Sequence, residues 1–274
     1  MGLATLKNKV AKTLRHLAAP VRPDEVRSAL AKVTGGGADI LFVHSSLSAC
    51  GNFTVGPKDV LAGLRDVAGT LSVPTHSYCY PKAIGEPGPV FDFCSTPSQN
   101  GVLTEIFRTQ PSVIRSINAT HSMAATGPLA EALVEGHEEL DAPCGAGSPY
   151  DRLIVRQASV LLFGVSFRSY TPYHTAEDAA GSPFAYEQGT IDRLRYIDRN
   201  GEMRERLSRR QSWTPRRFRE AGDLLEAAGL VRRESLGRGH LLFVPDCSKV
   251  HDFLVERLRK VPDFLYLTCT VPLQ

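Results

Sequence analysis

The sequence predicts an α/β fold: a single mixed α/β/α-type domain, with an α+β C-terminal portion past residue 190. Short apolar runs that fit buried strands alternate with segments whose apolar residues recur at helical spacing. Beyond residue 190 this alternation changes, and Asn200-Gly201 lies between two strand-like segments, as in a hairpin. The chain has 274 residues, 42% of them hydrophobic and 22% charged, which suits one large domain and excludes a disordered or coiled-coil protein.

Residues 1–20 are predicted to form an amphipathic helix, and residues 21–274 a single domain with its core motifs between 40 and 180. The helix is predicted from apolar residues at helical spacing, which are Leu3, Leu6, Val10, Leu14 and Leu17. Basic residues interrupt this face, so the segment lacks the continuous apolar stretch of a signal peptide. No apolar run approaches the roughly 20 residues of a membrane span, and we expect a cytoplasmic protein with no membrane partner.

The first elements are bounded by clear signals. A helix is expected over Pro23–Val33, because proline and acidic residues favour a first helical turn, and Gly35–Gly37 ends it. The apolar run Ile40–Val43 then predicts a buried strand. After Gly56-Pro57, one apolar face predicts a helix over Lys58–Val67, and Gly69-Thr70 turns into a strand over Leu71–Pro74.

The middle of the chain begins with Thr75–Gln99, which is rich in proline, glycine and tyrosine and lacks a sustained period. We expect a long loop there, and long loops in compact domains tend to be functional. Helices are expected over Val102–Thr109 and from Gly127-Pro128 to about His137, and Ser159–Val165 is the clearest buried strand. In the C-terminal portion we expect a hairpin over 194–207, a helix over 214–228, a strand over 241–244 and a helix over 247–260.

Charge and cysteine usage exclude several functional classes. Lys and Arg number 32 against 29 Asp and Glu, a balance too weak to indicate a nucleic-acid-binding protein. The six cysteines are widely spaced and form no C-x-x-C pair, so free thiols in a reducing compartment are expected. H-E-x-x-H is absent, His76, His121 and Cys79 lack ligand spacing, and no metal is predicted.

The segment His44-Ser45-Ser46-Leu47-Ser48 directly follows a predicted strand, where open α/β sheets bind ligands. Its hydroxyl and backbone N–H groups can hold a carbonyl or phosphate oxygen, although serines also favour ordinary turns. Phosphate loops of the G-x-x-x-x-G-K-[ST] or G-x-G-x-x-G type are absent, as is the G-x-S-x-G elbow of serine hydrolases.

A second candidate segment is Thr171–Glu177, a few residues after the clearest strand. If Pro172 lies in a first helical turn, His174 and Glu177 are three residues apart and share a face. A carboxylate beside an imidazole holds one tautomer and favours a general base, although a surface pair without a role has the same spacing. Tyr78, Tyr80, Tyr170 and Tyr173 are candidates to line a pocket or to fill the core.

Together these segments resemble the aminoglycoside N3-acetyltransferases, a family of acetyl-CoA-dependent antibiotic acetyltransferases unrelated in fold to the GNAT superfamily. The matching segments are His44–Ser48 with Gly51 and Gly56, Gly69–Leu71, Val73–Thr75, Thr96–Ser98 with Gly101, Phe107-Arg108, Arg115-Ser116, Thr120–Ser122, Gly127-Pro128, Gly147–Pro149, Leu161–Val165, Thr171, His174 and Glu177. Their order and spacing cover about residues 23–180, and the resemblance fades past 190.

The resemblance implies a fold, a reaction and roles for individual residues. The chain would bind acetyl-CoA and a small amine acceptor, without a metal or nucleic acid, and transfer the acetyl group; a homodimer stays open. The resemblance implies His174 as general base, Glu177 as its carboxylate partner and Thr171 near the thioester oxygen. Cofactor contacts are implied for His44, Ser45, Ser46, Leu47, Ser48, Thr75, Ser98, Gly101 and Arg108.

Two departures from the family pattern bear on the acceptor. Asn118-Ala119 stands where the family has His-Pro, so that loop is expected to differ in shape. The stretch Arg204–Arg219 holds seven arginines against one acid, Glu205, where carboxylates for a polycationic drug would be expected. We therefore keep three alternatives open: an acceptor amine that carries an anionic group, a non-catalytic binding protein on the same fold, and a nucleic-acid contact through the arginines.

Overall fold

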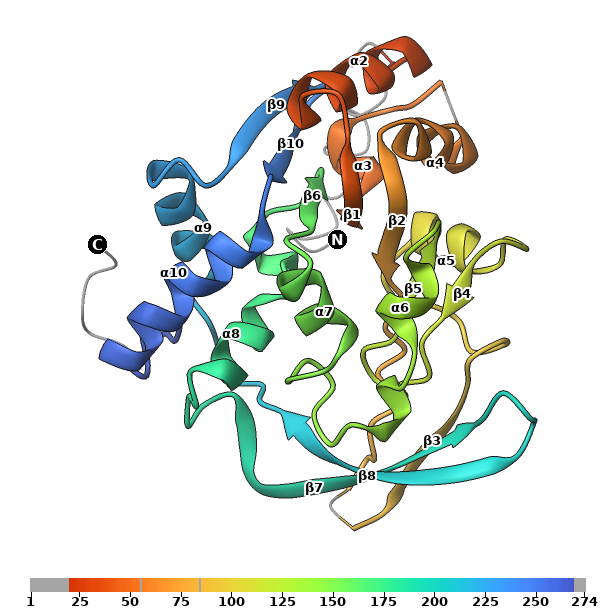
Figure 1. Ribbon diagram of the computed structural model, residues 1–274, viewed down its shortest axis with the longest axis vertical. Coiled ribbons are helices and arrows are strands. Elements are labelled where there is room, and N and C mark those ends of the chain that lie inside the picture. Colours follow the sequence, from red (N-terminus) through yellow and green to blue (C-terminus); the bar gives the residue numbers. More distant parts are fainter. Residues whose placement is uncertain (1–19, 55, 84, 269–274) are drawn as a thin grey trace, which may run out of the picture.

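The computed structural model describes residues 20–54, 56–83 and 85–268, so nearly all of the predicted helix at 1–20 lies outside the described residues (Figure 1). The main sheet has seven strands in the order β4-β5-β2-β1-β6-β10-β9, and a second sheet has the order β3-β7-β8. The strands are β1 (Ala38–Ser45), β2 (Ala68–Pro74), β3 (Pro87–Asp92), β4 (Ile114–Arg115), β5 (Met123–Thr126), β6 (Ser159–Phe163), β7 (Tyr186–Ile197), β8 (Met203–Gln211), β9 (Arg232–Leu236) and β10 (Gly239–Val244). The helices are α2 (Pro23–Thr34), α3 (Leu47–Cys50), α4 (Pro57–Asp66), α5 (Val102–Arg108), α6 (Ala130–Val134), α7 (Pro149–Val155), α8 (Tyr173–Ala179), α9 (Phe218–Ala227) and α10 (Cys247–Lys260), with short 3-10 turns at His137–Glu139 and Phe167–Ser169.

The central strands are buried on both faces, which explains why the sequence shows them as continuous apolar runs. β1 pairs in parallel with β2 on one side and with β6 on the other. Along β1, Phe42 faces one hydrophobic core and its neighbours Leu41 and Val43 face the other. This alternation follows from the two-residue period of a strand, and each apolar residue of the run is buried in one of two cores.

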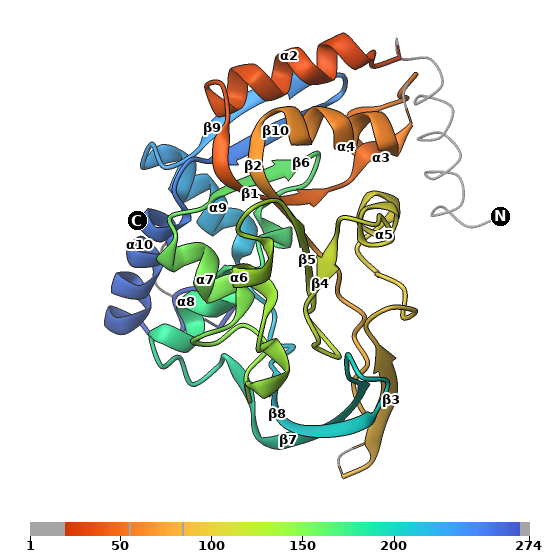
Figure 2. The same cartoon turned by 45° about the vertical axis from the view of Figure 1, so that its right-hand side comes forward.

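Helices cover both faces of the main sheet, as an α/β/α fold requires (Figure 2). α2, α4 and α5 pack their apolar residues into the core that contains Leu41 and Val43. α6 to α10 pack into the core that contains Phe42. The predicted α/β class is therefore confirmed. Among the described residues no helix combines the length and hydropathy needed to cross a bilayer.

The C-terminal portion is divided between the two sheets. The predicted hairpin is present, and its strands β7 and β8 extend well beyond the expected 194–207. They form the small sheet at the end of the molecule opposite α2 (Figure 1). The chain then returns, and β10 and β9 extend the main sheet with antiparallel pairing. The C-terminal portion thus completes the sandwich that the first 190 residues begin.

Several elements differ from the sequence-based expectation. The segment 75–99 is not wholly a loop, because it contains β3, whose prolines are tolerated at the edge of the small sheet. β5 has the sequence Met-Ala-Ala-Thr, which lacks β-branched and aromatic residues except for its last position, and β4 has only two residues. α9 begins at Phe218 and not at Thr214, because the backbone at Arg216 and Arg217 pairs with the segment after α10. α3, α7 and β9 were also not predicted.

Gly164 directly follows β6 and lies beside the predicted ligand-binding segment, and its backbone φ is +69°. A Cβ atom there would lie 2.5 Å from the Ser46 carbonyl oxygen and 2.9 Å from Cys50 Sγ. We expect Gly164→Ala to lower the free energy of unfolding by more than the about 1–3 kcal/mol of left-handed strain alone. Gly201→Ala is the matched control, since Gly201 has φ +81° with no atom near its Cβ position. Urea unfolding measures both variants, and equal losses would contradict the predicted clash.

Candidate active site

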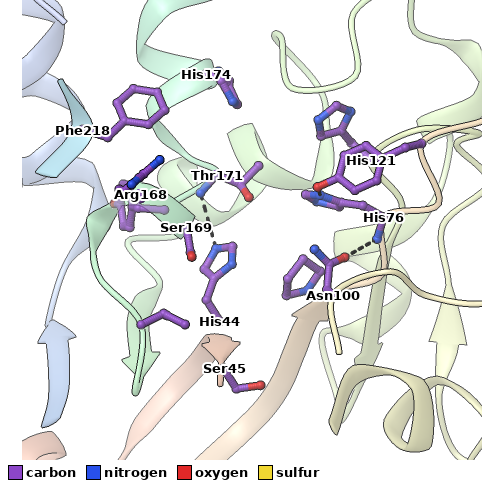
Figure 3. A pocket seen from close by; sticks show the side chains of 14 residues that line it. His44, Ser45, His76, Asn100, His121, Arg168, Ser169, Thr171, His174 and Phe218 are labelled. Atoms are coloured by element: carbon purple, nitrogen blue, oxygen red, sulfur yellow. Dashed lines mark hydrogen bonds between the residues drawn. The ribbon is translucent and has the colours of Figure 1, made fainter. Parts of the chain in front are cut away.

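The carboxyl ends of the three parallel strands β1, β2 and β6 meet at one edge of the main sheet, and a cavity of about 240 Å³ lies there (Figure 3). β1 contributes His44 and Ser45, the segment after β2 contributes His76, and the segment after β6 contributes Thr171 and His174. The remaining lining residues are Pro74, Tyr78, Asn100, His121, Val165, Arg168, Ser169, Tyr170 and Phe218. The fold thus brings both predicted segments to one cavity.

The His174–Glu177 pair forms as the spacing predicts. α8 begins directly after Pro172, and His174 Nδ1 lies 2.8 Å from Glu177 Oε2. Glu177 is fully buried, and its Oε1 also accepts hydrogen bonds from Arg216 Nε at 2.6 Å and from Tyr266 Oη at 2.7 Å. Burial by itself raises the pKa of Glu177, but the hydrogen bonds from His174 and Arg216 and the charge of Arg216 outweigh it, and the net pKa is lowered. The carboxylate is therefore ionised at neutral pH.

The Glu177 carboxylate determines which ring nitrogen of His174 carries the proton between them. An ionised carboxylate only accepts hydrogen bonds, so the Nδ1 of His174 carries a proton, and in the neutral ring the lone pair is on Nε2. The side chain of Gln211 lies beside this ring, and its Nε2 donates to the carbonyl oxygen of Ala185 at 2.8 Å. The side chain of His174 is 16% exposed, and it lines the cavity. The ring of His174 is thus oriented by Glu177 and borders the cavity.

His44 holds the segment that carries the other candidates. Its Nε2 accepts a hydrogen bond from the backbone N–H of Thr171 at 3.4 Å (Figure 3). Burial lowers the pKa of His44 to about 3, so its ring is neutral and can accept this bond. The bond joins the end of β1 to the residues just before α8, and it therefore couples the two segments predicted from sequence.

A chain of hydrogen bonds, in which each donor and acceptor can be assigned, holds the part of the cavity wall formed by His76 and Tyr78. Tyr150 Oη donates to the carbonyl oxygen of His121 at 3.0 Å, and it lies 2.8 Å from His76 Nε2. Because the single proton of Tyr150 is committed, His76 Nε2 is the donor, and His76 Nδ1 accepts from Tyr78 Oη at 3.0 Å. Burial lowers the pKa of His76 well below its ordinary value, with neighbouring histidines adding to the effect. Tyr78 adopts the left-handed region at φ +48°, a type of strain that concentrates at functional sites.

The predicted change of loop shape centres on Asn118. Its side-chain oxygen accepts hydrogen bonds from the backbone N–H groups of Thr120 and His121 at 3.1 and 2.8 Å and from the Thr120 hydroxyl at 3.0 Å. This Asx-type arrangement holds His121 at the cavity, where its ring lies 4.6 Å from that of His76. Burial lowers the pKa of His121 to about 3, so this ring is neutral as well.

A second cavity of about 180 Å³ adjoins the first. Tyr78, His121, His174 and Phe218 line both of them, and His174 therefore lies where the two cavities meet. The rest of its lining is Tyr80, Gln211, Ser212, Trp213 and Arg216. His174 thus borders two cavities, an arrangement that a group transfer between two substrates would need.

Comparisons with known proteins agree with this geometry. A family model described as aminoglycoside 3-N-acetyltransferase matches residues 42–259. The chain belongs to this family. It is 32% identical over 196 residues to aminoglycoside N(3)-acetyltransferase VII of Streptomyces paromomycinus, a match that covers 64% of this chain and 68% of that protein. The family match continues past residue 190, where the sequence pattern alone had faded.

Solved structures of the family support the same assignment. Aminoglycoside acetyltransferase AAC(3)-Xa is 26% identical with a TM-score of 0.78, over 93% of this chain and 98% of that chain. The enzyme AAC-IIIb, solved as a binary complex with CoASH, is 26% identical with a TM-score of 0.76, over 88% and 97% of the two chains. The resemblance stated from sequence is therefore confirmed, and the chain is an acyltransferase of the aminoglycoside N3-acetyltransferase family.

The structure separates the cofactor residues implied by the family into two groups. His44 and Ser45 line the first cavity. Ser46 lines neither cavity, and its backbone N–H donates to the carbonyl oxygen of Phe163. The others do not line either cavity. Leu47 packs against the hydrophobic core, Ser48 is exposed, and Thr75 is buried against Arg115 and Ser122. The Ser98 hydroxyl is hydrogen-bonded to that of Thr104, and Gly101 is the N-cap of α5. The Arg108 guanidinium donates to the Glu105 carboxylate and to the Cys94 carbonyl oxygen.

The arginine-rich stretch is not a patch of one charge. Arg209 pairs with Asp141 and Asp178, Arg210 pairs with Asp192, and Arg204 pairs with Asp198 and Glu202. Arg216 is the buried partner of Glu177. The acids come from other segments, so the local sequence could not show them. The local excess of arginine is therefore offset by carboxylates of other segments for these four arginines.

Other residues of the site were not predicted. The side-chain oxygen of Asn100 accepts a hydrogen bond from the backbone N–H of His76 at 2.5 Å. Gln211, Ser212 and Arg216 line the second cavity. Their only local signal is that Gln211–Thr214 interrupts the arginines. Among the described residues no group of three or more His, Cys, Asp or Glu is placed to hold a metal, and the five described cysteines are unpaired.

Proposed function

We propose that this protein transfers the acetyl group of acetyl-CoA directly to a primary amine of an aminoglycoside or a related amine, with His174 as general base. The observation that carries the proposal is the His174–Glu177 pair at the junction of the two cavities. The thioester would enter the first cavity and the amine the second. Membership of the acetyltransferase family and the CoASH complex of the relative AAC-IIIb support acetyl-CoA as the donor.

The residues of the first cavity fit coenzyme A. Arg168 lines it, is exposed, and has no carboxylate partner among the described residues, so its guanidinium is free to pair with phosphate. The Ser45 and Thr171 hydroxyl groups also line this cavity. They would donate hydrogen bonds to the thioester oxygen as it becomes negative, an effect typically worth about 3–4 kcal/mol per donor.

The reaction then needs one nucleophile and one base. The amine nitrogen attacks the thioester carbonyl carbon, the C–S bond breaks, and CoA leaves as the thiolate. The proton lost by the nitrogen passes to Nε2 of His174, and the resulting imidazolium is stabilised by the Glu177 carboxylate. The imidazolium can return the proton to the CoA thiolate, which completes the cycle.

Direct transfer is favoured over an acetylated enzyme. An acetylated enzyme would need a nucleophile such as the thiol of Cys79 or the hydroxyl of Ser122. Burial raises the pKa of the Cys79 thiol, and the hydroxyl of the buried Ser122 donates to the carbonyl oxygen of Thr75 at 2.6 Å. Neither residue lines a cavity or contacts a base, so neither meets the requirements of an activated nucleophile.

A thiol-release assay with acetyl-CoA and primary amines tests this function. We expect release of CoA that depends on the amine and persists in a chelator. Glu177→Gln should lower kcat by less than loss of the imidazole does, since the ring remains but is oriented and charged less well. Glu256→Gln is the matched control, because Glu256 pairs only with Lys260 on the surface of α10.

Circular dichroism must accompany the Glu177→Gln assay, because a variant that leaves Arg216 buried without its partner can lose several kcal/mol of stability. A folded Glu177→Gln with wild-type kcat would contradict the role of the carboxylate. Binding of CoA without release of thiol for any amine would instead support the non-catalytic alternative.

A further inference from the structure

We propose that the acceptor is a small amine with one aromatic ring and one positive charge, and not a polycationic sugar. This inference rests on the proposed function and names the substrate class of the second cavity. It is carried by three features of that cavity: its aromatic wall, its lack of carboxylates and an unpartnered amide oxygen beside the base.

Aromatic side chains dominate the wall of the second cavity. Tyr80 stacks on Tyr78 with ring centres 6.5 Å apart, and Trp213 meets Tyr80 edge-on at 5.8 Å. Phe218 closes the wall near His174, with ring centres 5.7 Å apart. The volume of about 180 Å³ compares with the roughly 150 Å³ of a protein cavity that binds benzene. The cavity therefore suits a single ring that packs on aromatic faces.

Negative charge is scarce around both cavities. No aspartate or glutamate lines either of them, and none occurs among the residues outside the described part of the chain. Glu177 lies behind His174, but Arg216 neutralises it. Among the described residues, Glu187 is the one further carboxylate bonded to a lining residue, through the backbone N–H of Trp213. Several ammonium groups would thus be desolvated without partners, whereas a single reacting amine can pass its proton to His174.

Gln211 supplies a polar contact for the amine. Gln211 is buried, with an exposed fraction of 5%, and it lines the second cavity. Its Nε2 donates to the Ala185 carbonyl oxygen, but its Oε1 has no hydrogen-bond partner among the described residues. Buried acceptors are normally satisfied, so this oxygen points to a missing donor. An amine N–H beside His174 would be that donor.

Trp213 makes the proposal measurable without turnover. It is the only tryptophan of the chain, it is 66% exposed, and it forms part of the aromatic wall. We would titrate the protein, saturated with CoA, with 2-phenylethylamine, with 2-cyclohexylethylamine and with gentamicin, and follow tryptophan fluorescence. We expect a saturable change with 2-phenylethylamine, at least tenfold weaker binding of the cyclohexyl amine and no saturable change with gentamicin.

The same amines are then compared by kcat/KM with acetyl-CoA. We expect 2-phenylethylamine to exceed gentamicin at least tenfold, and Trp213→Ala to raise the KM for 2-phenylethylamine about tenfold without a change in the KM for acetyl-CoA. Leu207→Ala is the control, because Leu207 is as exposed as Trp213 is and lies on β8 away from both cavities.

Each outcome separates the inference from the proposed function. Turnover of gentamicin with higher kcat/KM than 2-phenylethylamine would overturn the inference and leave acetyl transfer intact. Saturable binding of 2-phenylethylamine without acetylation of any amine would support the cavity assignment and overturn the proposed function. Equal binding of the phenyl and cyclohexyl amines would overturn the aromatic part of the inference.

Discussion

Replacement of His174 by alanine is expected to lower kcat about 10²–10⁴-fold, the usual contribution of a general base, with little change in the KM for acetyl-CoA. The reason is geometric: Glu177 holds the proton on Nδ1, and His174 lies where the two cavities meet. The side chain is not part of the hydrophobic cores, so the variant should fold. Steady-state thiol release at saturating acetyl-CoA measures kcat.

Two additional measurements make this result specific. Added imidazole should restore part of the His174→Ala activity, because it can occupy the space left by the ring and accept the proton. His251→Ala on α10 is the control for loss of a histidine elsewhere, since His251 lines neither cavity. If His174→Ala retained near wild-type kcat at saturating substrates, the general-base role would be wrong.

The second large effect concerns stability in acid. Four buried histidines have lowered pKa values because burial disfavours their charged form: His44 and His121 at about 3, His137 at about 4, and His76 well below its ordinary value. In the unfolded chain each titrates near pH 6.5. Below that pH the unfolded state binds protons that the folded state does not. Stability is therefore complete above pH 6.5 and is lost as the pH falls toward the folded values.

The expected loss is large relative to the stability of a domain. Each histidine contributes about 1.4 kcal/mol between pH 7.5 and 5.5, so the four together remove about 5 kcal/mol from the free energy of unfolding. Typical domains have only about 5–15 kcal/mol in total. Urea unfolding at the two pH values measures the loss.

His137→Gln is the variant that tests the linkage, because His137 is buried away from both cavities. It should reduce the pH dependence by about a quarter, whatever its effect on stability at pH 7.5. A free energy of unfolding that is the same at pH 7.5 and pH 5.5 would show that these histidines are not neutral in the folded state.

The parts of the fold with strong local signals could be predicted from the sequence. α10 follows the expected bounds Cys247–Lys260, and α2 begins at Pro23, because apolar periodicity and first-turn residues depend only on neighbours. The apolar runs at 40–43 and 159–165 were also sufficient to predict the strands β1 and β6, since a strand buried on both faces is apolar throughout. β5 was missed because its alanines pack well only against neighbours already in place.

In the candidate site, too, the local contacts could be predicted from the sequence and the long-range contacts could not. The spacing of His174 and Glu177 on one helical face was enough to predict their contact, because that contact is local. The partners of Glu177 are Arg216 and Tyr266, which lie 39 and 89 residues further along the chain. No local pattern links such residues, so the neutralised carboxylate and the aromatic second cavity became evident only in three dimensions.

Identification of the reaction product tests the central claim most directly. The protein is incubated with acetyl-CoA and 2-phenylethylamine, and mass spectrometry measures N-acetylated amine and free CoA in the same sample, for the wild type and for His174→Ala. We predict equal amounts of acetylated amine and CoA from the wild type, at least a hundredfold slower formation of both by the variant, and no acetyl group on the protein. Equal rates for the two proteins, or acetyl-enzyme that forms without the amine and passes its acetyl group to it, would contradict direct transfer assisted by His174.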